Sequence, residues 1–584
     1  MTDGPGLSDG RSGGRVRAVV FRGLVALATL ATLRSLAALL GLAHAGWIAA
    51  AAGVPLAALA AWRVGEPAEF LPPAATLPVW RAPQPMAPVR GVLAVGAAAT
   101  ALTLLPLLIH PLPPFDDYLN HLARIFIIAA HGRDPLLARF YTIEWRLIPN
   151  LAMDLLVPPL VPLLGIFVAG KLFLVITTLL LLGGPLAIHW ALYRRLSAGP
   201  LAAALFLHTY VEKMGVLNYQ FSVGLALLMV AAWIGLERRG ALLRGVVSGG
   251  FVVVLFFGHL VALGIYGIGI TAVAAAGGRR RPADAAALLL PFGLVWPLLL
   301  LGPGDSPPLL PDAWGGVGAR LNALRLLFAG YDPVLDALLL LGLAAGLLLA
   351  VRAGGLRLHP AGWMTLLLGG AVFLVMPNRV MGSWGGAAWL AFGLVMLLSG
   401  MLWWRWPGRR AMVAFVALLL LRVAATEEGF IRYDRVQREV VASLAQLAPG
   451  SRILIAADYD HADDALRAIW DLPCLAVMTR SSLVSLVYTD PRQQVLTLRP
   501  AWRGMAGGYN DDPVALPDLL YPPAQDAAPD TLPYDPSGRI YWRDWPHDYD
   551  NIYVMDRLGA GSPDPARLVA LFAAGRVQLF QVRP

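Results

Sequence analysis

Long uninterrupted apolar segments constrain the fold of this chain more than any other feature of its sequence. Segments 91–109 (GVLAVGAAATALTLLPLLI) and 171–192 (KLFLVITTLLLLGGPLAIHWAL) are each long enough to cross the hydrocarbon core of a bilayer as one helix. Hydrophobic residues make up 58% of the 584 residues and charged residues 14%, a composition well outside that of soluble domains. The sequence therefore predicts a polytopic α-helical membrane protein.

Similar segments recur as far as residue 424, and we expect about thirteen transmembrane helices. Charged residues are rare inside these segments, and Arg34 and Lys171 are the main ones. The segments are 23–42, 45–62, 91–110, 168–192, 199–213, 216–236, 242–257, 259–277, 284–302, 333–351, 361–377, 384–404 and 410–424.

The distribution of positive charge indicates how these helices are oriented. The formal net charge is +9, yet residues 425–584 carry 15 Arg and Lys against 21 Asp and Glu, so the excess belongs to the membrane part. Short basic loops mark the cytoplasmic side. They predict a cytoplasmic N-terminus, an external C-terminal region, a bacterial-type cytoplasmic membrane as the location, and no nucleic-acid partner. The basic loops are 11–17, 193–195, 237–239, 278–281, 352–357 and 403–410.

Changes in composition divide the chain into five parts. The last part contains β-branched and aromatic runs typical of strands, and shorter helical patterns. Cys474, in this last part, is the only cysteine of the whole sequence, which excludes an intrachain disulfide and a cysteine-based metal site. The parts are a cytoplasmic tail (1–22), a transmembrane hairpin (23–62), a Pro-rich cytoplasmic linker (63–90), a transmembrane domain (91–424) with its first external loop at 111–167, and an external α/β domain (425–584). In the α/β domain we expect strands at 452–457, 475–479, 482–488, 494–498, 551–556 and 577–582, and helices at 463–470 and 565–575.

The first external loop opens with a cluster of polar residues, PPFDDYLNHLAR (113–124). Two prolines end the preceding segment, and the pattern from Asp117 onward predicts a helix. On a helical wheel Asp117, Asn120, His121 and Arg124 share about one third of the circumference, and apolar residues fill the opposite side. We therefore expect an amphipathic helix that lies flat at the external surface of the membrane.

The adjacent carboxylates Asp116 and Asp117 have two interpretations. In the first, one of them caps the helix, and the polar face of the helix is solvated. In the second, the pair is catalytic, because neighbouring carboxylates differ in pKa and one of them can serve as a general base. Arg124, two turns along the same face, helps the site to tolerate two negative charges.

The layout of this loop resembles that of the GT-C glycosyltransferases. In that family an acidic pair follows an early transmembrane helix, at the start of a long external loop with an interfacial helix, and many members carry a mixed α/β domain after their last span. The motif DDYLNHLAR (116–124) resembles the family's Asp-rich motif, and the likeness in layout covers residues 91–584. The hairpin 23–62 has no obvious counterpart in the minimal family core.

The resemblance implies an enzyme that moves a sugar from a polyprenyl-phosphate carrier to an envelope glycan, lipid or protein acceptor on the outer face of the membrane. Asp116 or Asp117 would then be the general base. Arg379, in the external turn MPNRVMGSWG (376–385), would hold the carrier phosphate, because it departs from the basic-inside trend. Its alternative role is contact with ordinary lipid headgroups. Other substrate-binding candidates are Asn120, His121, Arg124, Lys213 (or else paired with Glu212) and His259 (or else a buried histidine).

The sequence leaves the cofactor and two competing functions open. Asp116, Asp117 and His121 offer oxygen and nitrogen ligands for a divalent cation, although no spacing demands one. A transporter or flippase for a lipid-linked envelope precursor would instead show charged residues at mid-membrane depth, broken helices and paired repeats. A non-catalytic envelope assembly factor would use the external domain to bind a partner. Membrane lipids are partners under every interpretation.

Overall fold

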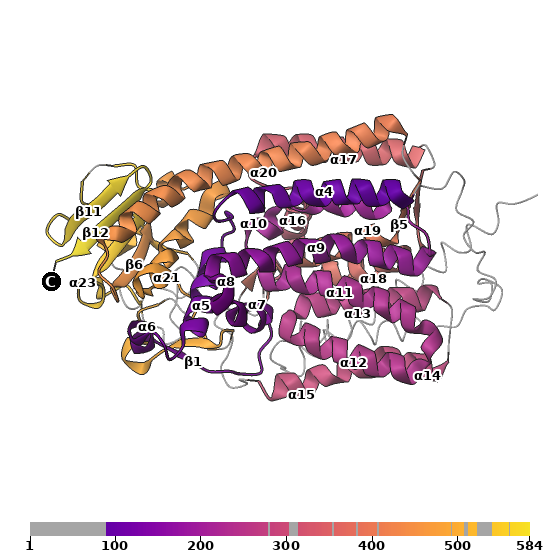
Figure 1. The fold of residues 1–584 in the computed structure, drawn as a ribbon, viewed down its shortest axis with the longest axis horizontal. Coiled ribbons are helices and arrows are strands. Elements are labelled where there is room, and N and C mark those ends of the chain that lie inside the picture. The colour runs from indigo at the N-terminus through magenta and orange to yellow at the C-terminus, as the bar shows by residue number, and fades with distance from the viewer. Residues whose placement is uncertain are drawn as a thin grey trace, which may run out of the picture.

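The computed structural model describes residues 89–583, with gaps at 278–280, 303–312, 353–354, 381–382, 406–407, 492, 507–511, 522–539 and 560. The expected N-terminal tail, the hairpin 23–62 and almost all of the linker lie outside the described residues. Most of the described chain is helical, and the long helices lie side by side along the long axis of the molecule (Figure 1).

Six helical segments in the described part are long and apolar enough to cross a membrane. In α17, only 6% of the apolar window is buried inside the protein, and Leu341 and Leu349 are 66% and 65% exposed. A helix that is apolar all round yet exposed requires a lipid environment. The six agree with the prediction of a helical membrane protein, while the count of about thirteen stays a prediction. They are α4 (Val89–Ile109), α9 (Ile166–Tyr193), α11 (Leu217–Gly235) with η4 (Leu236–Arg239), α12 (Ala241–Gly258), α14 (Pro282–Leu289) with η5 (Leu290–Leu294) and α15 (Val295–Leu300), and α17 (Pro333–Arg352).

α11 is the most buried of these segments and packs against α9 and α13 (Leu260–Ala276). Glycines allow the close approach of α9 and α11. A Cβ atom at Gly184 would lie 2.5 Å from Leu227, and one at Gly224 would lie 2.5 Å from Leu180. Shorter elements complete the bundle: α16 (Gly316–Arg325), α18 (Pro360–Val375), α19 (Gly386–Met401), the β2–β5 pair (Leu356–Leu358 and Leu402–Trp404) and the β3–β4 hairpin (Arg379–Val380 and Ser383–Trp384).

The predicted span 199–213 is wrong as a continuous helix. It consists of a 3-10 helix, η3 (Gly199–Phe206), and a single α-turn, α10 (Tyr210–Lys213), separated by His208 in the left-handed conformation (φ 55°). Hydrogen bonds that involve side chains replace the helical ones at His208. Its backbone amide donates to a Glu212 carboxylate oxygen at 2.6 Å, and its side-chain Nε2 lies 2.9 Å from the Thr103 carbonyl.

The last predicted apolar segment ends at residue 424, but α20 (Arg409–Ser443) continues beyond it for almost twenty residues. The predicted domain boundary at this residue stays a prediction. The apolar run ends there, but the helical period does not. Phe430, Tyr433, Val436 and Val440, spaced by three or four residues, are all buried. α20 thus runs unbroken from the helix bundle into the C-terminal region (Figure 1).

The C-terminal region contains a six-stranded mixed sheet with the order β11-β12-β10-β6-β7, and β9 also pairs with β6. β6 is parallel to β10, β7 and β9, with Leu454 opposite Ile552, whereas β12 is antiparallel to β10 and β11. The strands are β6 (Arg452–Ala457), β7 (Leu483–Val484), β9 (Val514–Ala515), β10 (Asn551–Met555), β11 (Leu568–Ala574) and β12 (Val577–Val582). Short helices surround the sheet: η6 (Leu444–Gln446), η7 (Tyr459–His461), η8 (Asp464–Cys474), α21 (Leu475–Arg480), η9 (Pro500–Trp502), α22 (Leu516–Leu520) and α23 (Trp545–Asp548).

Two predictions in this region are wrong. The expected strand 475–479 is the helix α21, and the expected helix 565–575 contains the strand β11. Short apolar runs suit either structure, so tertiary pairing decides between them. β11 forms a hairpin with β12 through Gly575, which has a positive φ of 51°. The expected helix 463–470 overlaps the 3-10 element η8, which begins at Asp464 and ends at Cys474.

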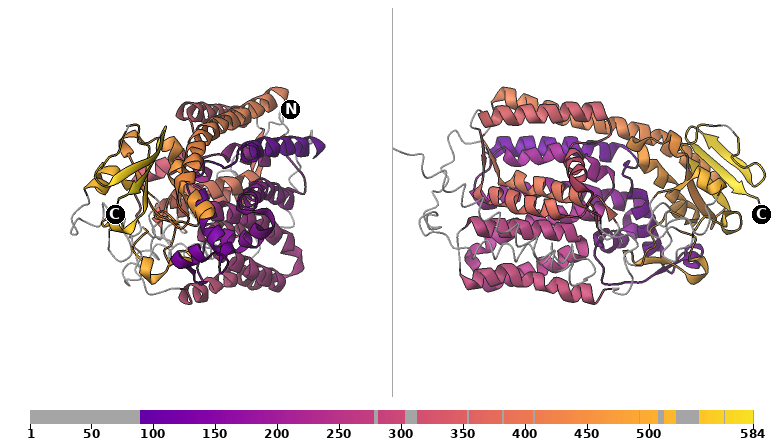
Figure 2. Two further views of the ribbon diagram at one scale, coloured as in Figure 1. Left: turned by 60° about the vertical axis from the view of Figure 1, so that its left-hand side comes forward. Right: turned by 180° about the vertical axis from the view of Figure 1, so that it is seen from behind.

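The first loop packs where the helix bundle meets the C-terminal region. α5 (Tyr118–Ala130) is separate from α4 and contacts α9 on one side and η8 and α21 on the other. β1 (Tyr141–Ile143) pairs with β8 (Leu496–Leu498), so the loop is joined to the C-terminal region by a two-stranded sheet. Seen from behind, the C-terminal region covers one end of the bundle (Figure 2). The loop also contains α6 (Pro135–Phe140), α7 (Ala152–Leu156), η2 (Pro158–Leu160) and α8 (Val161–Leu164).

Candidate functional site

The backbone of the acidic pair docks onto the junction between α10 and α11. The Asp116 amide donates to the Lys213 carbonyl at 2.7 Å, and the Asp117 amide donates to the Met214 carbonyl at 3.3 Å. Gly215 has a positive φ of 75°, and a Cβ atom there would lie 2.7 Å from the Asp117 nitrogen. The pair is therefore fixed by a close backbone contact that requires glycine at position 215. Both aspartates are partly exposed, although the residues on either side are buried.

Asp117 stands at the N-cap position of α5 but makes no side-chain capping hydrogen bond. Its Oδ1 atom instead accepts a hydrogen bond from the Tyr488 hydroxyl at 2.9 Å. Asn120 holds the same segment, because its Nδ2 donates to the Leu486 carbonyl at 2.6 Å and its Oδ1 accepts from the Tyr488 amide at 3.0 Å. The capping interpretation therefore does not describe Asp117, whose carboxylate points to the C-terminal region.

Asp116 lies among two buried tyrosines and a lysine. Burial, together with the negative charges of Glu212 and Asp116, raises the pKa of Tyr331 well above its ordinary value. Burial and a set of carboxylates that includes Asp116 do the same for the pKa of Tyr433. Both phenols therefore stay protonated at neutral pH. The Lys213 Nζ atom lies 5.8 Å from the centre of the Tyr331 ring.

We call Asp116, Asp117, Lys213, Tyr331, Tyr433 and Tyr488 the carboxylate site. Sequence reasoning found the aspartates and Lys213 but missed the three tyrosines. Each tyrosine lies more than a hundred residues further along the chain, in a segment without a local motif. Only the fold brings them to the start of α5.

The predicted solvated face of the helix at 117–130 is wrong, because Asn120, His121 and Arg124 are 0%, 5% and 0% exposed. Arg124 forms a two-point ion pair with Asp154 of α7, with Nε–Oδ1 and Nη2–Oδ2 distances of 2.7 and 3.0 Å. Burial and the Arg124 charge hold the pKa of His121 well below its ordinary value, so its imidazole is neutral. α5 is covered on both faces, by the helix bundle and by the C-terminal region.

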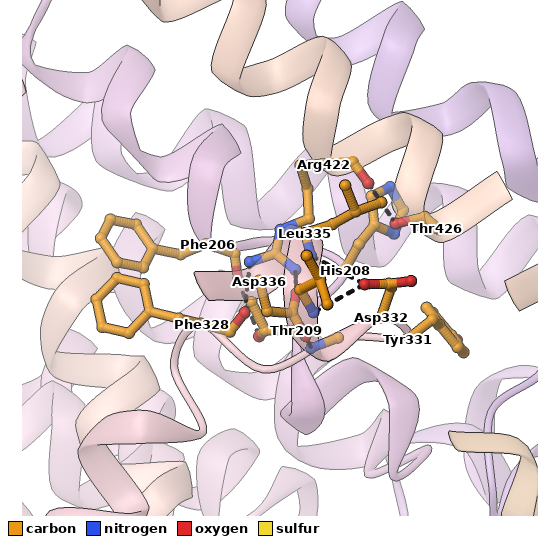
Figure 3. A network of polar contacts seen from close by, with 12 residues as sticks. Phe206, His208, Thr209, Phe328, Tyr331, Asp332, Leu335, Asp336, Arg422 and Thr426 are labelled. Carbon is orange, nitrogen blue, oxygen red and sulfur yellow. Dashed lines mark hydrogen bonds and ion pairs between the residues drawn. The ribbon is translucent and has the colours of Figure 1, made fainter. Parts of the chain in front are cut away.

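A second polar group lies between helices of the bundle (Figure 3). Arg422 of α20 pairs with Asp336 of α17 at 2.8 Å and donates to the Phe328 carbonyl at 2.7 Å. Beside them, His208 Nδ1 lies 3.1 Å from a Glu212 carboxylate oxygen. The structure therefore gives Glu212 a histidine partner, and its predicted pairing with Lys213 stays a prediction.

Arg422 and Asp336 were both missed, although each lies inside a predicted span. The expectation that Arg34 and Lys171 are the main charges within the spans is therefore incomplete. Lys171 does reach the end of its helix, because its Nζ donates to the His110 carbonyl just after α4. A charge inside an apolar segment was the available signal for the Arg422–Asp336 pair.

The other two substrate-binding candidates, Arg379 and His259, each lie beside a tryptophan. Arg379 lies in the β3–β4 hairpin, with its guanidinium 5.0 Å from the centre of the Trp384 ring, and α19 begins directly after this hairpin. His259 caps α13 by accepting from the Val261 amide at 3.2 Å. Its ring lies 5.5 Å from that of Trp389. These contacts leave the predicted substrate-binding roles of Arg379 and His259 as predictions.

A metal site involving Asp116, Asp117 and His121 also stays a prediction. Among the residues that the structure describes, no group of three or more His, Cys, Asp or Glu side chains is arranged to hold a metal ion. His121 is close to Arg124, whose positive charge disfavours a nearby cation.

Comparison of the chain with protein-family models, with curated proteins and with solved structures finds no match. The function is therefore inferred from the site alone.

Proposed function

We propose that this chain is a membrane glycosyltransferase of the GT-C type, which moves a sugar from a polyprenyl-phosphate carrier to an envelope glycan, lipid or protein acceptor. The observation that carries this proposal is the carboxylate site. Two adjacent, partly exposed aspartates are fixed through their backbone beside a lysine, where the helix bundle meets the C-terminal region. This is where a lipid carrier in the membrane and an acceptor outside it would meet.

The site supplies the groups that such a transfer needs. One aspartate of the pair accepts the proton of the acceptor hydroxyl while that oxygen forms a bond to the anomeric carbon. The bond from that carbon to the carrier phosphate oxygen breaks, and the carrier phosphate leaves with the electron pair. The other carboxylate stabilises the positive charge that develops on the sugar ring. Lys213 compensates the charge of the phosphate, and the protonated Tyr433 donates a hydrogen bond, whereas the Tyr331 hydroxyl already donates to the Pro114 carbonyl at 3.1 Å.

The residues on α5 divide between binding and positioning in this proposal. Asn120 and Arg124 are occupied by buried bonds to the C-terminal region and to α7, so they position the helix. His121, neutral and close to the Tyr488 ring at 6.2 Å between centroids, borders the site. Arg379 contacts Trp384, and Lys213 contacts the acidic pair through the hydrogen bond between its carbonyl and the Asp116 amide.

The proposed orientation places α5 and the C-terminal α/β region on the outer face of a bacterial-type cytoplasmic membrane. Cysteine labelling tests it, because the native Cys474 is fully buried and gives little background. In intact spheroplasts an impermeant maleimide should label Leu558→Cys, which replaces a 60% exposed residue, but not Arg195→Cys in a basic loop. The opposite labelling pattern would invert the topology and remove the enzyme from its substrates.

The catalytic test uses Asp116→Asn and Asp117→Asn in the purified full-length protein. Sugar transfer from polyprenyl-phosphate donors should fall by roughly two to four orders of magnitude in the variant that lacks the base. Binding of the donor should change little, because the base acts on the acceptor. Lys213→Met should weaken donor binding and turnover together. Asp460→Asn, at an exposed aspartate, is the matched control and should transfer at the wild-type rate. Wild-type transfer by both aspartate variants would refute the assignment.

A transporter for a lipid-linked precursor is the second candidate, and two observations favour it. Arg422 and Asp336 form an ion pair inside the helix bundle, and the segment 199–213 is a broken helix. Both features are typical of transport pathways. Proteoliposomes that translocate a labelled lipid-linked glycan, unaffected by Asp116→Asn and Asp117→Asn but inactivated by Arg422→Met, would favour the transporter. An assembly factor would show neither transfer nor translocation.

A further inference from the structure

A cavity of about 520 Å³ opens in the C-terminal region at the carboxyl ends of two parallel strands, β6 and β10. The segment after β6 supplies Tyr459 and Asp463, and the cavity is also lined by Arg467, Trp470, Asp512 and Arg576. The carboxyl edge of parallel strands is where α/β sheets usually bind ligands. The volume falls within the range of small-molecule sites, roughly 300–1,000 Å³.

A buried aspartate holds two of the side chains that line this cavity. Asp556, 1% exposed, directly follows β10 and has a positive φ of 60°. Its two carboxylate oxygens accept hydrogen bonds from Trp470 Nε1 at 2.8 Å and from Arg576 Nη1 at 2.5 Å. A strained backbone that is held by two side-chain bonds indicates a preformed site.

The charges around the cavity compensate one another. Arg576 pairs with Asp556, and Arg467 pairs with Asp512. Asp463 in turn lies 3.5 Å from Arg432 of α20. Because each guanidinium already faces a carboxylate, the cavity offers many hydrogen-bonding groups but little net charge. Such a lining suits a neutral ligand that is rich in hydroxyl groups better than a phosphate.

The cavity also contains an aromatic surface. Tyr459 is 41% exposed, and its ring packs edge-on against Trp470 at 5.1 Å between centroids. The Tyr459 hydroxyl donates to the Pro513 carbonyl at 2.7 Å, which fixes the ring in place. A fixed, exposed aromatic ring next to polar side chains can pack against the apolar face of a sugar ring while the hydroxyl groups find polar partners.

Arg432 connects this cavity to the carboxylate site. Its Nη1 atom faces Asp463 in the cavity, and its Nη2 atom donates to the Tyr331 carbonyl at 3.0 Å. Tyr331 is the phenol that lies beside Asp116 and Lys213. The cavity is thus connected to the carboxylate site through the Arg432 side chain and Tyr331.

We propose that this cavity binds a neutral saccharide unit. Its further assignment as the site that holds a glycan acceptor next to the acidic pair rests on the proposed function. The binding itself does not, because it needs neither a donor nor a base.

The binding experiment uses the full-length protein in detergent and a panel of neutral gluco-, manno- and galacto-oligosaccharides, with inorganic phosphate as the anionic probe. At least one neutral oligosaccharide should bind, detected by calorimetry and by tryptophan fluorescence. Tyr459→Ala should weaken that binding roughly five- to tenfold through loss of the ring. Tyr459→Phe, which keeps the ring, should bind within about twofold of wild type. Tyr521→Ala is the matched control, since Tyr521 lies in the same region, is 81% exposed and does not line the cavity.

Asp512→Asn tests the charge argument independently of the aromatic ring. It removes the negative charge of position 512 beside the Arg467 guanidinium, so inorganic phosphate should bind this variant at least several-fold more tightly than wild type. Wild-type protein that binds phosphate better than every neutral oligosaccharide would overturn the proposal. Failure of all the oligosaccharides to bind, or binding that Tyr459→Ala leaves unchanged, would overturn it as well.

Sugar transfer separates the two proposals. If the cavity holds the acceptor, Tyr459→Ala should raise the KM for the acceptor and leave kcat nearly unchanged, whereas the aspartate variants should lower kcat. Normal oligosaccharide binding by a protein without transferase activity would refute the proposed function and leave the saccharide site intact. Transfer at the wild-type rate and KM by Tyr459→Ala would remove the cavity from the reaction.

Discussion

The buried ion pair between Arg124 and Asp154 offers the sharpest test of how the carboxylate site is held in place. Both side chains are 0% exposed, and two hydrogen bonds of 2.7 and 3.0 Å join them. Arg124→Met would leave the Asp154 carboxylate buried without its counter-charge. Breaking a buried pair in this way typically costs about 3–5 kcal/mol of unfolding free energy. Asp154→Leu, which strands the guanidinium, should cost a similar amount.

The double variant Arg124→Met/Asp154→Leu should be much less destabilised than either single variant. Removing both charges avoids desolvating either of them, and apolar replacements of buried pairs are often neutral or stabilising by about 1–4 kcal/mol. The Arg124 Nη1 atom has no hydrogen-bond partner among the described residues, which lowers what the pair contributes. We therefore expect the double variant to unfold within about 1 kcal/mol of wild type.

Thermal unfolding of the detergent-solubilised protein gives the order of stabilities, and amide exchange on α5 shows whether the loss is local. Arg146→Met is the matched control, because Arg146 pairs with Glu144 at the surface, where the side chains are 34% and 41% exposed. It should change stability by less than about 1 kcal/mol. A double variant as unstable as the less stable of the two single variants would refute the reasoning. An Arg124→Met protein as stable as wild type would refute it as well.

Three further predictions concern the surroundings of the acidic pair. Burial opposes protonation of His110, but hydrogen bonds to two α20 carboxylates, at 2.8 and 2.5 Å, raise its pKa. Protonated His110 therefore stabilises the folded protein fully below about pH 6.5, and this contribution is lost as the pH rises through the raised pKa. Melting temperatures from pH 5 to 9 should fall through that window in wild type but not in His110→Asn. Tyr488→Phe removes the hydroxyl that donates a hydrogen bond to the Asp117 carboxylate, so the acid limb of the pH–rate profile should shift to higher pH. An acid limb at the same pH as in wild type would place Asp117 outside the reaction. Gly215→Ala should lower the melting temperature more than Gly132→Ala, which has the same positive φ but open space around it; equal losses would contradict the close contact with Asp117.

The sequence predicts those elements whose burial or lipid contact depends on their own residues. α4, α9, α12 and α17 follow from apolar runs of sufficient length, and β6, β10 and β12 follow from β-branched and aromatic runs. It fails where tertiary contacts decide the structure. β11 is a strand because β12 is available to pair with it, and the segment 199–213 breaks because His208 finds partners in Glu212 and in the Thr103 carbonyl.

The residues of the candidate site likewise separate into those that the local sequence reveals and those that only tertiary contacts reveal. Asp116 and Asp117 stand out locally, as adjacent acids after a helix-ending proline pair. A helical wheel identifies the polar face of α5, but it does not show what covers that face. Here Asp154 and the segment around Tyr488 cover it, from 30 and more than 360 residues away along the chain. The predicted solvated surface is therefore a buried contact between two regions of the protein.

This burial changes the role of the C-terminal region. It binds α5 through Asn120 and through the Tyr488 hydroxyl, and it pairs β8 with β1 of the same loop. α20, one continuous helix, carries Arg432 between the carboxylate site and the saccharide cavity. A general base at the start of α5 and a saccharide in the cavity would therefore be held on one packed body rather than across a flexible tether. Their separation would be set by side-chain packing, which is the condition for orienting an acceptor hydroxyl toward a carboxylate before the sugar arrives.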